Sequence, residues 1–127
     1  MKIEHIAIWT LHLEEMKTFY ETYFSAKAGK QYHNPAKQFR SYFLSFDEGP
    51  RMELMHRPGM SQNSGSTDLT GITHLAFSAG SRAAVDQLTE KLRHEGYVVA
   101  GEPRVTGDGY YESVILDPDG NHIEITE

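Results

Sequence analysis

The order of apolar and polar residues along the chain repeats itself once. A strand-like alternation at residues 2–10 is followed by apolar residues at helical spacing over 13–24. The same succession of patterns returns at 71–79 and 82–95, where Ser81 stands at the position of a helix N-cap. Each half of the chain is therefore predicted to open with a strand that leads into a helix.

Short strands complete both halves. They are predicted at 39–46 and 51–56 in the first half and at 97–100, 110–117 and 122–126 in the second, whereas 26–33 has a weak pattern. Each half reads as a βαβββ module, over 1–57 and 71–127, with a Gly-, Ser- and Pro-rich connector at 58–70. The residues DPDGN at 117–121 predict a tight hairpin, because proline presets φ and glycine accepts φ > 0.

Individual residues support a duplicated module. The run IEHIAIWT begins at Ile3 and aligns with ITHLAFSA, so that His5 matches His74. Later in each half a strand carries one glutamate between apolar neighbours, Glu53 and Glu124, at nearly the same spacing from its histidine. A chain of 127 residues suits one domain better than two, so we expect residues 1–127 to form a single domain with a shared core.

Composition and charge narrow the function classes. The formal net charge is −6 and Lys and Arg do not cluster, which disfavours nucleic acid and anionic membranes as partners. A small-molecule or protein partner is expected instead. The absence of cysteine excludes disulfides, thiolate metal ligands and a cysteine nucleophile. Because the N-terminus enters a strand and no apolar run reaches membrane-spanning length, we expect a cytoplasmic protein.

The paired histidines and glutamates point to metal chemistry. If the halves are related by a pseudo-twofold axis, His5, Glu53, His74 and Glu124 can converge on one point. Two imidazoles and two carboxylates suit one divalent ion such as Zn²⁺, Ni²⁺, Co²⁺, Mn²⁺ or Fe²⁺. The alternative is that each histidine is an ordinary hydrogen-bonded core residue and each glutamate is solvated. The same residue types at equivalent places in both halves favour the metal site.

The motifs EHIAI near the N-terminus, THLAFS after the midpoint and DPDGNHIEI at the C-terminus resemble the vicinal oxygen chelate superfamily, which includes glyoxalase I. The resemblance implies an α+β fold in which two βαβββ modules form curved mixed sheets around a central metal cavity, often in a homodimer. The His, Glu, His, Glu set resembles the glyoxalase I branch. By this resemblance the metal stabilises an enediolate of a substrate with vicinal oxygens, and Glu124 or Glu53 moves the proton.

The chain also departs from the glutathione-using glyoxalases. Trp9 stands where they have an arginine and Arg57 where they have an asparagine, which disfavours a glutathione adduct as substrate. Trp9, Arg57 and His122 are therefore candidates for binding a different substrate, with core packing or solvent exposure as the alternative for each. Two other enzyme classes stay open, an extradiol dioxygenase and a thiol transferase resembling those for fosfomycin resistance. So does a non-catalytic protein that binds a small molecule.

Overall fold

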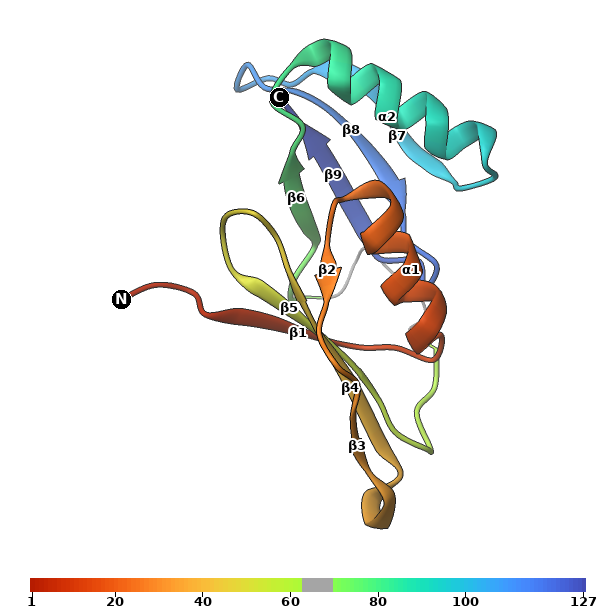
Figure 1. Cartoon of the computed structure of the whole chain (residues 1–127). Coiled ribbons are helices and arrows are strands. Elements are labelled where there is room, and N and C mark those ends of the chain that lie inside the picture. Colours follow the sequence, from red (N-terminus) through yellow and green to blue (C-terminus); the bar gives the residue numbers. More distant parts are fainter. Residues whose placement is uncertain (63–69) are drawn as a thin grey trace. The chain divides into compact units, whose positions relative to one another are not determined.

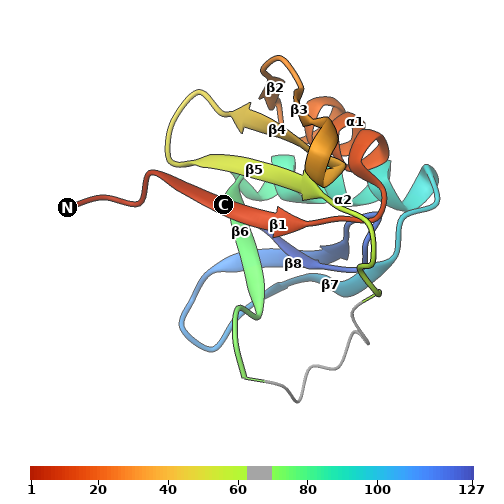
Figure 2. The same ribbon diagram turned by 90° about the horizontal axis from the view of Figure 1, so that it is seen from below.

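The computed structural model describes residues 1–62 and 70–127, and the chain divides into two compact units, residues 1–63 and 64–127. In each unit an α-helix lies along one face of a β-sheet (Figures 1 and 2). This confirms the predicted α+β class. Most of the predicted connector at 58–70 falls on residues 63–69, which lie outside the described residues.

The first unit is a five-stranded sheet with helix α1 packed against it. Its elements are, in chain order, β1 (His5–Trp9), α1 (Leu13–Tyr23), β2 (Lys27–Ala28), β3 (Tyr32–Asn34), a short 3-10 helix (Pro35–Lys37), β4 (Phe39–Ser45) and β5 (Arg51–His56). The strand order is β1-β5-β4-β2, and β3 also pairs with β4. β1 runs parallel to β5, and the other pairs are antiparallel. The first and last strands of the unit therefore lie side by side.

The second unit repeats this plan with four strands. Its elements are β6 (His74–Ser78), α2 (Arg82–His94), β7 (Val99–Val105), β8 (Tyr111–Leu116) and β9 (His122–Thr126). The strand order is β6-β9-β8-β7, with β6 parallel to β9 and the other pairs antiparallel. Here too the first strand of the unit pairs with its last, as in the first unit.

Each helix creates a hydrophobic core on the face of the sheet that it covers. The buried side chains include Leu13, Met16, Phe19, Tyr20, Leu44, Met52 and Leu54 in the first unit and Val85, Leu92, Ile115, Ile123 and Ile125 in the second. Burying one Leu or Ile side chain contributes about 1.5–3 kcal/mol, so the inward face of each strand is strongly specified. Because side chains alternate along a strand, the residues between these point to the sheet face that carries no helix.

Local signals in the second unit act as the sequence predicts. The Ser81 hydroxyl accepts a hydrogen bond from the backbone N–H of Ala84 at 3.2 Å and caps α2. In the hairpin, the Asp117 carboxylate accepts the backbone N–H of Asp119 at 3.0 Å and that of Asn121 at 2.9 Å. Gly120 adopts a φ of +83°, which glycine tolerates without strain. The hairpin connects β8 to β9.

The strand bounds differ from the sequence prediction in two ways. The leading strands were expected over 2–10 and 71–79 but span His5–Trp9 and His74–Ser78, because their partners begin only opposite His5 and His74. The strand expected at 97–100 extends over Val99–Val105 as an edge strand with irregular register. Edge strands tolerate a proline such as Pro103, which interrupts the sequence pattern of this strand.

Candidate metal centre

The matching histidines and glutamates occupy equivalent places in the two sheets. In the first unit Glu53 pairs with Ala7, two residues after His5 on β1. In the second unit Glu124 pairs with Ala76, two residues after His74 on β6. The neighbours of both glutamates along the strand are buried against the helix, so the glutamates themselves lie on the face that the helix leaves open. The sequence repeat is thus also a repeat in strand register.

The pair in the second unit is in close contact. Nε2 of His74 lies 3.5 Å from Oε2 of Glu124, and the side chains are 45% and 16% exposed respectively. Glu124 is on β9, which lies between β6 and β8, so both neighbouring strands support its backbone. One imidazole nitrogen and one carboxylate of this unit therefore lie close enough to act on the same bound group.

The histidine of the first unit is oriented by a further carboxylate. Nδ1 of His5 lies 2.5 Å from Oε2 of Glu4, to which it donates a hydrogen bond, so Nε2 is the ring nitrogen that could bind a metal ion. Glu4 also accepts hydrogen bonds from the Arg51 guanidinium, from Nε at 2.9 Å and from Nη2. The hydrogen bonds from His5 and Arg51 lower the pKa of Glu4, so it remains a carboxylate. The His5 and Phe43 rings are nearly perpendicular, with their centroids 5.4 Å apart.

These residues fit a divalent ion in their chemistry. A histidine that binds a metal through one nitrogen commonly donates its other N–H to a carboxylate, and His5 has this arrangement with Glu4. Two imidazoles and two carboxylates also match the donors that zinc and related ions use. Within residues 1–62 and 70–127, no three such side chains already gather around a common point. The convergence of His5 and Glu53 with His74 and Glu124 stays a prediction.

A carboxyl group that the sequence analysis overlooked lies beside Glu124. The burial of Glu112 on β8, followed by the negative charge of the nearby Glu124, raises the pKa of Glu112. The Arg104 guanidinium lies 3.6 Å from the Glu112 carboxylate, whose side chain is only 12% exposed. Glu112 is a neighbour of Glu124 because Val114, two residues after Glu112 on β8, pairs with Glu124. Only that pairing register could have revealed Glu112.

The three candidate substrate-binding residues lie on open sheet faces or at their ends. Trp9 follows His5 and Ala7 on the same face of β1 and is 46% exposed. The Arg57 guanidinium stacks over the Trp9 ring, with Cζ 4.8 Å from the ring centroid. His122 pairs directly with His74 and is half-buried on the same strand face as Glu124. Their role in binding substrate stays a prediction.

The family of the chain follows from comparison with known proteins. A family profile described as the Glyoxalase/Bleomycin resistance protein/Dioxygenase superfamily matches residues 2–125. The chain belongs to this superfamily, as its sequence motifs predict. The uncharacterised protein YqjT of Bacillus subtilis (strain 168) is 45% identical over 58 residues, which span 43% of this chain and 45% of that relative.

Solved structures share the fold at low sequence identity. A glyoxalase family protein from Enterococcus faecalis is 23% identical with a TM-score of 0.81, covering 99% of this chain and 97% of that one. Glyoxalase I from Zea mays is 22% identical with a TM-score of 0.81; the match covers 98% of this chain but only 44% of the maize chain. The trypanothione-dependent glyoxalase I of Leishmania major is 19% identical with a TM-score of 0.80, covering 100% and 86%. These likenesses show the fold.

In the part of the chain that the structure describes, no helix is long and apolar enough to span a membrane.

Proposed function

We propose that this protein is a metal-dependent enzyme of the glyoxalase type, a lyase or isomerase that acts on a small substrate with vicinal oxygens. His5, Glu53, His74 and Glu124 would hold one divalent ion, Zn²⁺, Ni²⁺, Co²⁺, Mn²⁺ or Fe²⁺. The observation that carries the proposal is the repeated His and Glu pair, at the same strand register and on the open sheet face in both units. A structural role alone gives no reason for both units to keep this pair.

The residues would divide the reaction between them. A bound divalent ion supplies a Lewis acid for the two neighbouring oxygens of the substrate. Glu124 would take a proton from one carbon and return it to the adjacent one, with Glu53 as the alternative base. The Glu124 side chain is 16% exposed and lies beside His74, so the substrate would meet a partly dehydrated carboxylate. Glu4 would keep the His5 ring oriented through its hydrogen bond to Nδ1.

The substrate would not be a glutathione adduct. The Trp9 side chain cannot form an ion pair with a glutathione carboxylate, and Arg57 stacks on its ring instead. One solved structure with this fold, from Leishmania major, is described as trypanothione-dependent, so the fold accommodates another thiol. The homodimer and the cytoplasmic location expected from the sequence are further parts of this proposal.

Two measurements on the same sample test the proposal. Elemental analysis of protein purified without chelators should find about one divalent ion per chain. A methylglyoxal assay with several thiols, glutathione and trypanothione among them, should find turnover with at least one thiol and weak or no turnover with glutathione. Protein that contains no stoichiometric metal, and does not bind any when offered the five ions, would refute the proposal.

The same sample separates the competing classes. Turnover of a catechol with Fe²⁺ would indicate an extradiol dioxygenase, and thiol addition to fosfomycin with Mn²⁺ would indicate a thiol transferase. If no reaction is found and His5→Ala and Glu124→Ala leave small-molecule binding intact, the protein is a non-catalytic binding module.

A further inference from the structure

An aromatic cluster lies in the first unit, on and beside strand β1. The Trp9 ring meets the Phe39 ring edge-on with centroids 6.1 Å apart, and the Tyr32 ring lies 6.0 Å from Phe39. Trp9 is 46% exposed and Tyr32 is 56% exposed. Three strands, β1, β3 and β4, contribute one ring each. The rings therefore form a partly exposed aromatic surface rather than part of the buried core.

This cluster is distinct from the core of the unit. The core residues Leu44, Met52 and Leu54 lie under α1. Trp9 and His5 alternate with half-buried residues along β1 and share its opposite face. Large aromatic rings that remain exposed side by side are unfavourable in water unless something covers them, and such patches mark binding sites.

Arg57 gives the aromatic cluster a positive charge. Its guanidinium stacks on Trp9 at 4.8 Å, and within the described residues it has no carboxylate partner. Because the chain carries a formal net charge of −6, a guanidinium that has no carboxylate partner among the described residues is an unusual feature beside exposed rings. Arg40 on β4 interacts instead with Glu14 of α1, whose pKa is lowered by hydrogen bonds with Lys17 and Tyr42 and, to a smaller extent, by the charge of Arg40. Among residues 1–62 and 70–127, Arg57 is thus the cation that stacks on this aromatic cluster.

We propose that Trp9, Phe39, Tyr32 and Arg57 form a binding platform for an aromatic carboxylate, whose ring stacks on the aromatic side chains while its anionic group pairs with Arg57. The platform rests on the proposed function in one respect: it would hold the part of the substrate remote from the reacting oxygens. Trp9 follows His5 by four residues, roughly 13 Å at about 3.3 Å per residue of strand. The substrate class is then an elongated molecule with vicinal oxygens at one end and an aromatic acid at the other.

Ligand binding can be followed directly because Trp9 is the single tryptophan of the chain. The full-length protein is titrated with phenylacetate while the Trp9 emission is recorded with excitation near the red edge of indole absorption. The emission should change saturably. Acetate, which has no ring, should give no such change, and benzyl alcohol, which has no charge, should bind about tenfold more weakly than phenylacetate.

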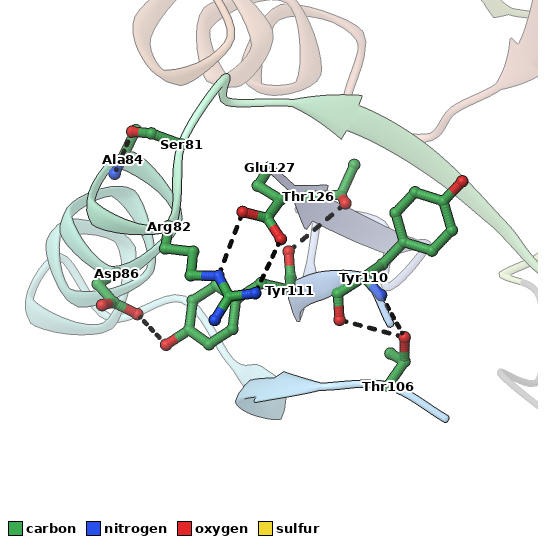
Figure 3. A network of polar contacts seen from close by, with 9 residues as sticks. All are labelled: Ser81, Arg82, Ala84, Asp86, Thr106, Tyr110, Tyr111, Thr126 and Glu127. Carbon is green, nitrogen blue, oxygen red and sulfur yellow. Dashed lines mark hydrogen bonds and ion pairs between the residues drawn. The ribbon is translucent and has the colours of Figure 1, made fainter. Parts of the chain in front are cut away.

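Variants separate the charge from the rings. Arg57→Gln should weaken phenylacetate binding about tenfold and leave benzyl alcohol nearly unaffected. Arg82→Gln is the matched control, because Arg82 also stacks on a ring, that of Tyr111 at 5.1 Å, but pairs with Glu127 at 3.2 Å (Figure 3). It should bind phenylacetate as the unmodified chain does. Tyr32→Leu, at a largely exposed position, should weaken both aromatic ligands without unfolding the protein.

The proposal is overturned if phenylacetate leaves the Trp9 emission unchanged, if acetate acts like phenylacetate, or if Arg57→Gln binds phenylacetate as tightly as the unmodified chain. The metal content of the same sample distinguishes this failure from failure of the enzymatic proposal. Protein that binds phenylacetate but no metal supports the platform and refutes the metal centre. Protein that binds metal but not phenylacetate refutes the platform and supports the metal centre.

Discussion

Replacing Asp117 tests how the C-terminal hairpin holds strand β9. The Asp117 side chain is 4% exposed and accepts three hydrogen bonds. One comes from the backbone of Asp119, one from the backbone of Asn121 and one from the Asn121 amide, at 3.0, 2.9 and 2.9 Å. Asp117→Ala removes both acceptor oxygens and leaves the three donors without this partner.

The cost follows from these contacts. A hydrogen bond to a charged group contributes about 1.5–3 kcal/mol, and water can replace part of it in a half-buried hairpin. We therefore expect Asp117→Ala to lower the free energy of unfolding by about 3 kcal/mol. Asp117→Asn keeps the oxygen that accepts both backbone N–H groups but turns a donor toward the Asn121 amide, so it should cost only about 1 kcal/mol.

Urea unfolding followed by far-UV circular dichroism measures both variants. The midpoint should fall for Asp117→Ala and fall much less for Asp117→Asn, with unchanged slopes. Equal destabilisation by the two variants would show that the charge, rather than the two backbone hydrogen bonds, stabilises the hairpin. A variant Asp117→Ala as stable as the unmodified chain would refute the reasoning altogether.

Three further predictions concern the core, a helix cap and a titrating carboxyl. Leu54→Ala empties a fully buried position on β5 and should cost about 2–5 kcal/mol, whereas Ile3→Ala, at a site 66% exposed, should change stability by less than about 0.5 kcal/mol in urea unfolding. Ser81→Ala removes the cap of α2 and should lower the free energy of unfolding by about 1 kcal/mol. A melting curve identical to that of the unmodified chain would contradict this. Burial and the charge of Glu124 raise the pKa of Glu112. Between the pKa of Glu112 in the unfolded state and its higher pKa in the folded state, the folded protein keeps a proton that the unfolded chain has lost, so stability falls as the pH rises through this range. Glu112→Gln should therefore stabilise the protein more at about pH 7 than at about pH 4; an equal effect at both would contradict this sign.

The sequence was most informative where one strong pattern decides the structure. The helix beginning at Arg82 follows from its apolar spacing and from Ser81 as cap, and the hairpin follows from DPDGN. The βαβββ repeat followed from the matching of His5 with His74. All of these depend on residues close together in the chain or on the internal repeat.

The strand ends and the surroundings of the glutamates could not be predicted in this way. β1 begins at His5 only because its partner β5 begins at Arg51, which is a property of pairing between distant segments. Glu112 lies beside Glu124 because β8 and β9 pair in one particular register. The orientation of His5 by Glu4 depends on side-chain rotamers, which no residue pattern specifies.

Metal retention by four single variants tests the central claim most directly. His5→Ala, Glu53→Ala, His74→Ala and Glu124→Ala are each purified, checked for folding by circular dichroism, loaded with Zn²⁺ or Ni²⁺ and analysed for bound metal. A shared site predicts about one ion per unmodified chain and markedly weaker binding in every one of the four folded variants. If the pair of either unit can be removed without affecting the ion, the four residues do not share a metal and the proposed catalytic centre is wrong.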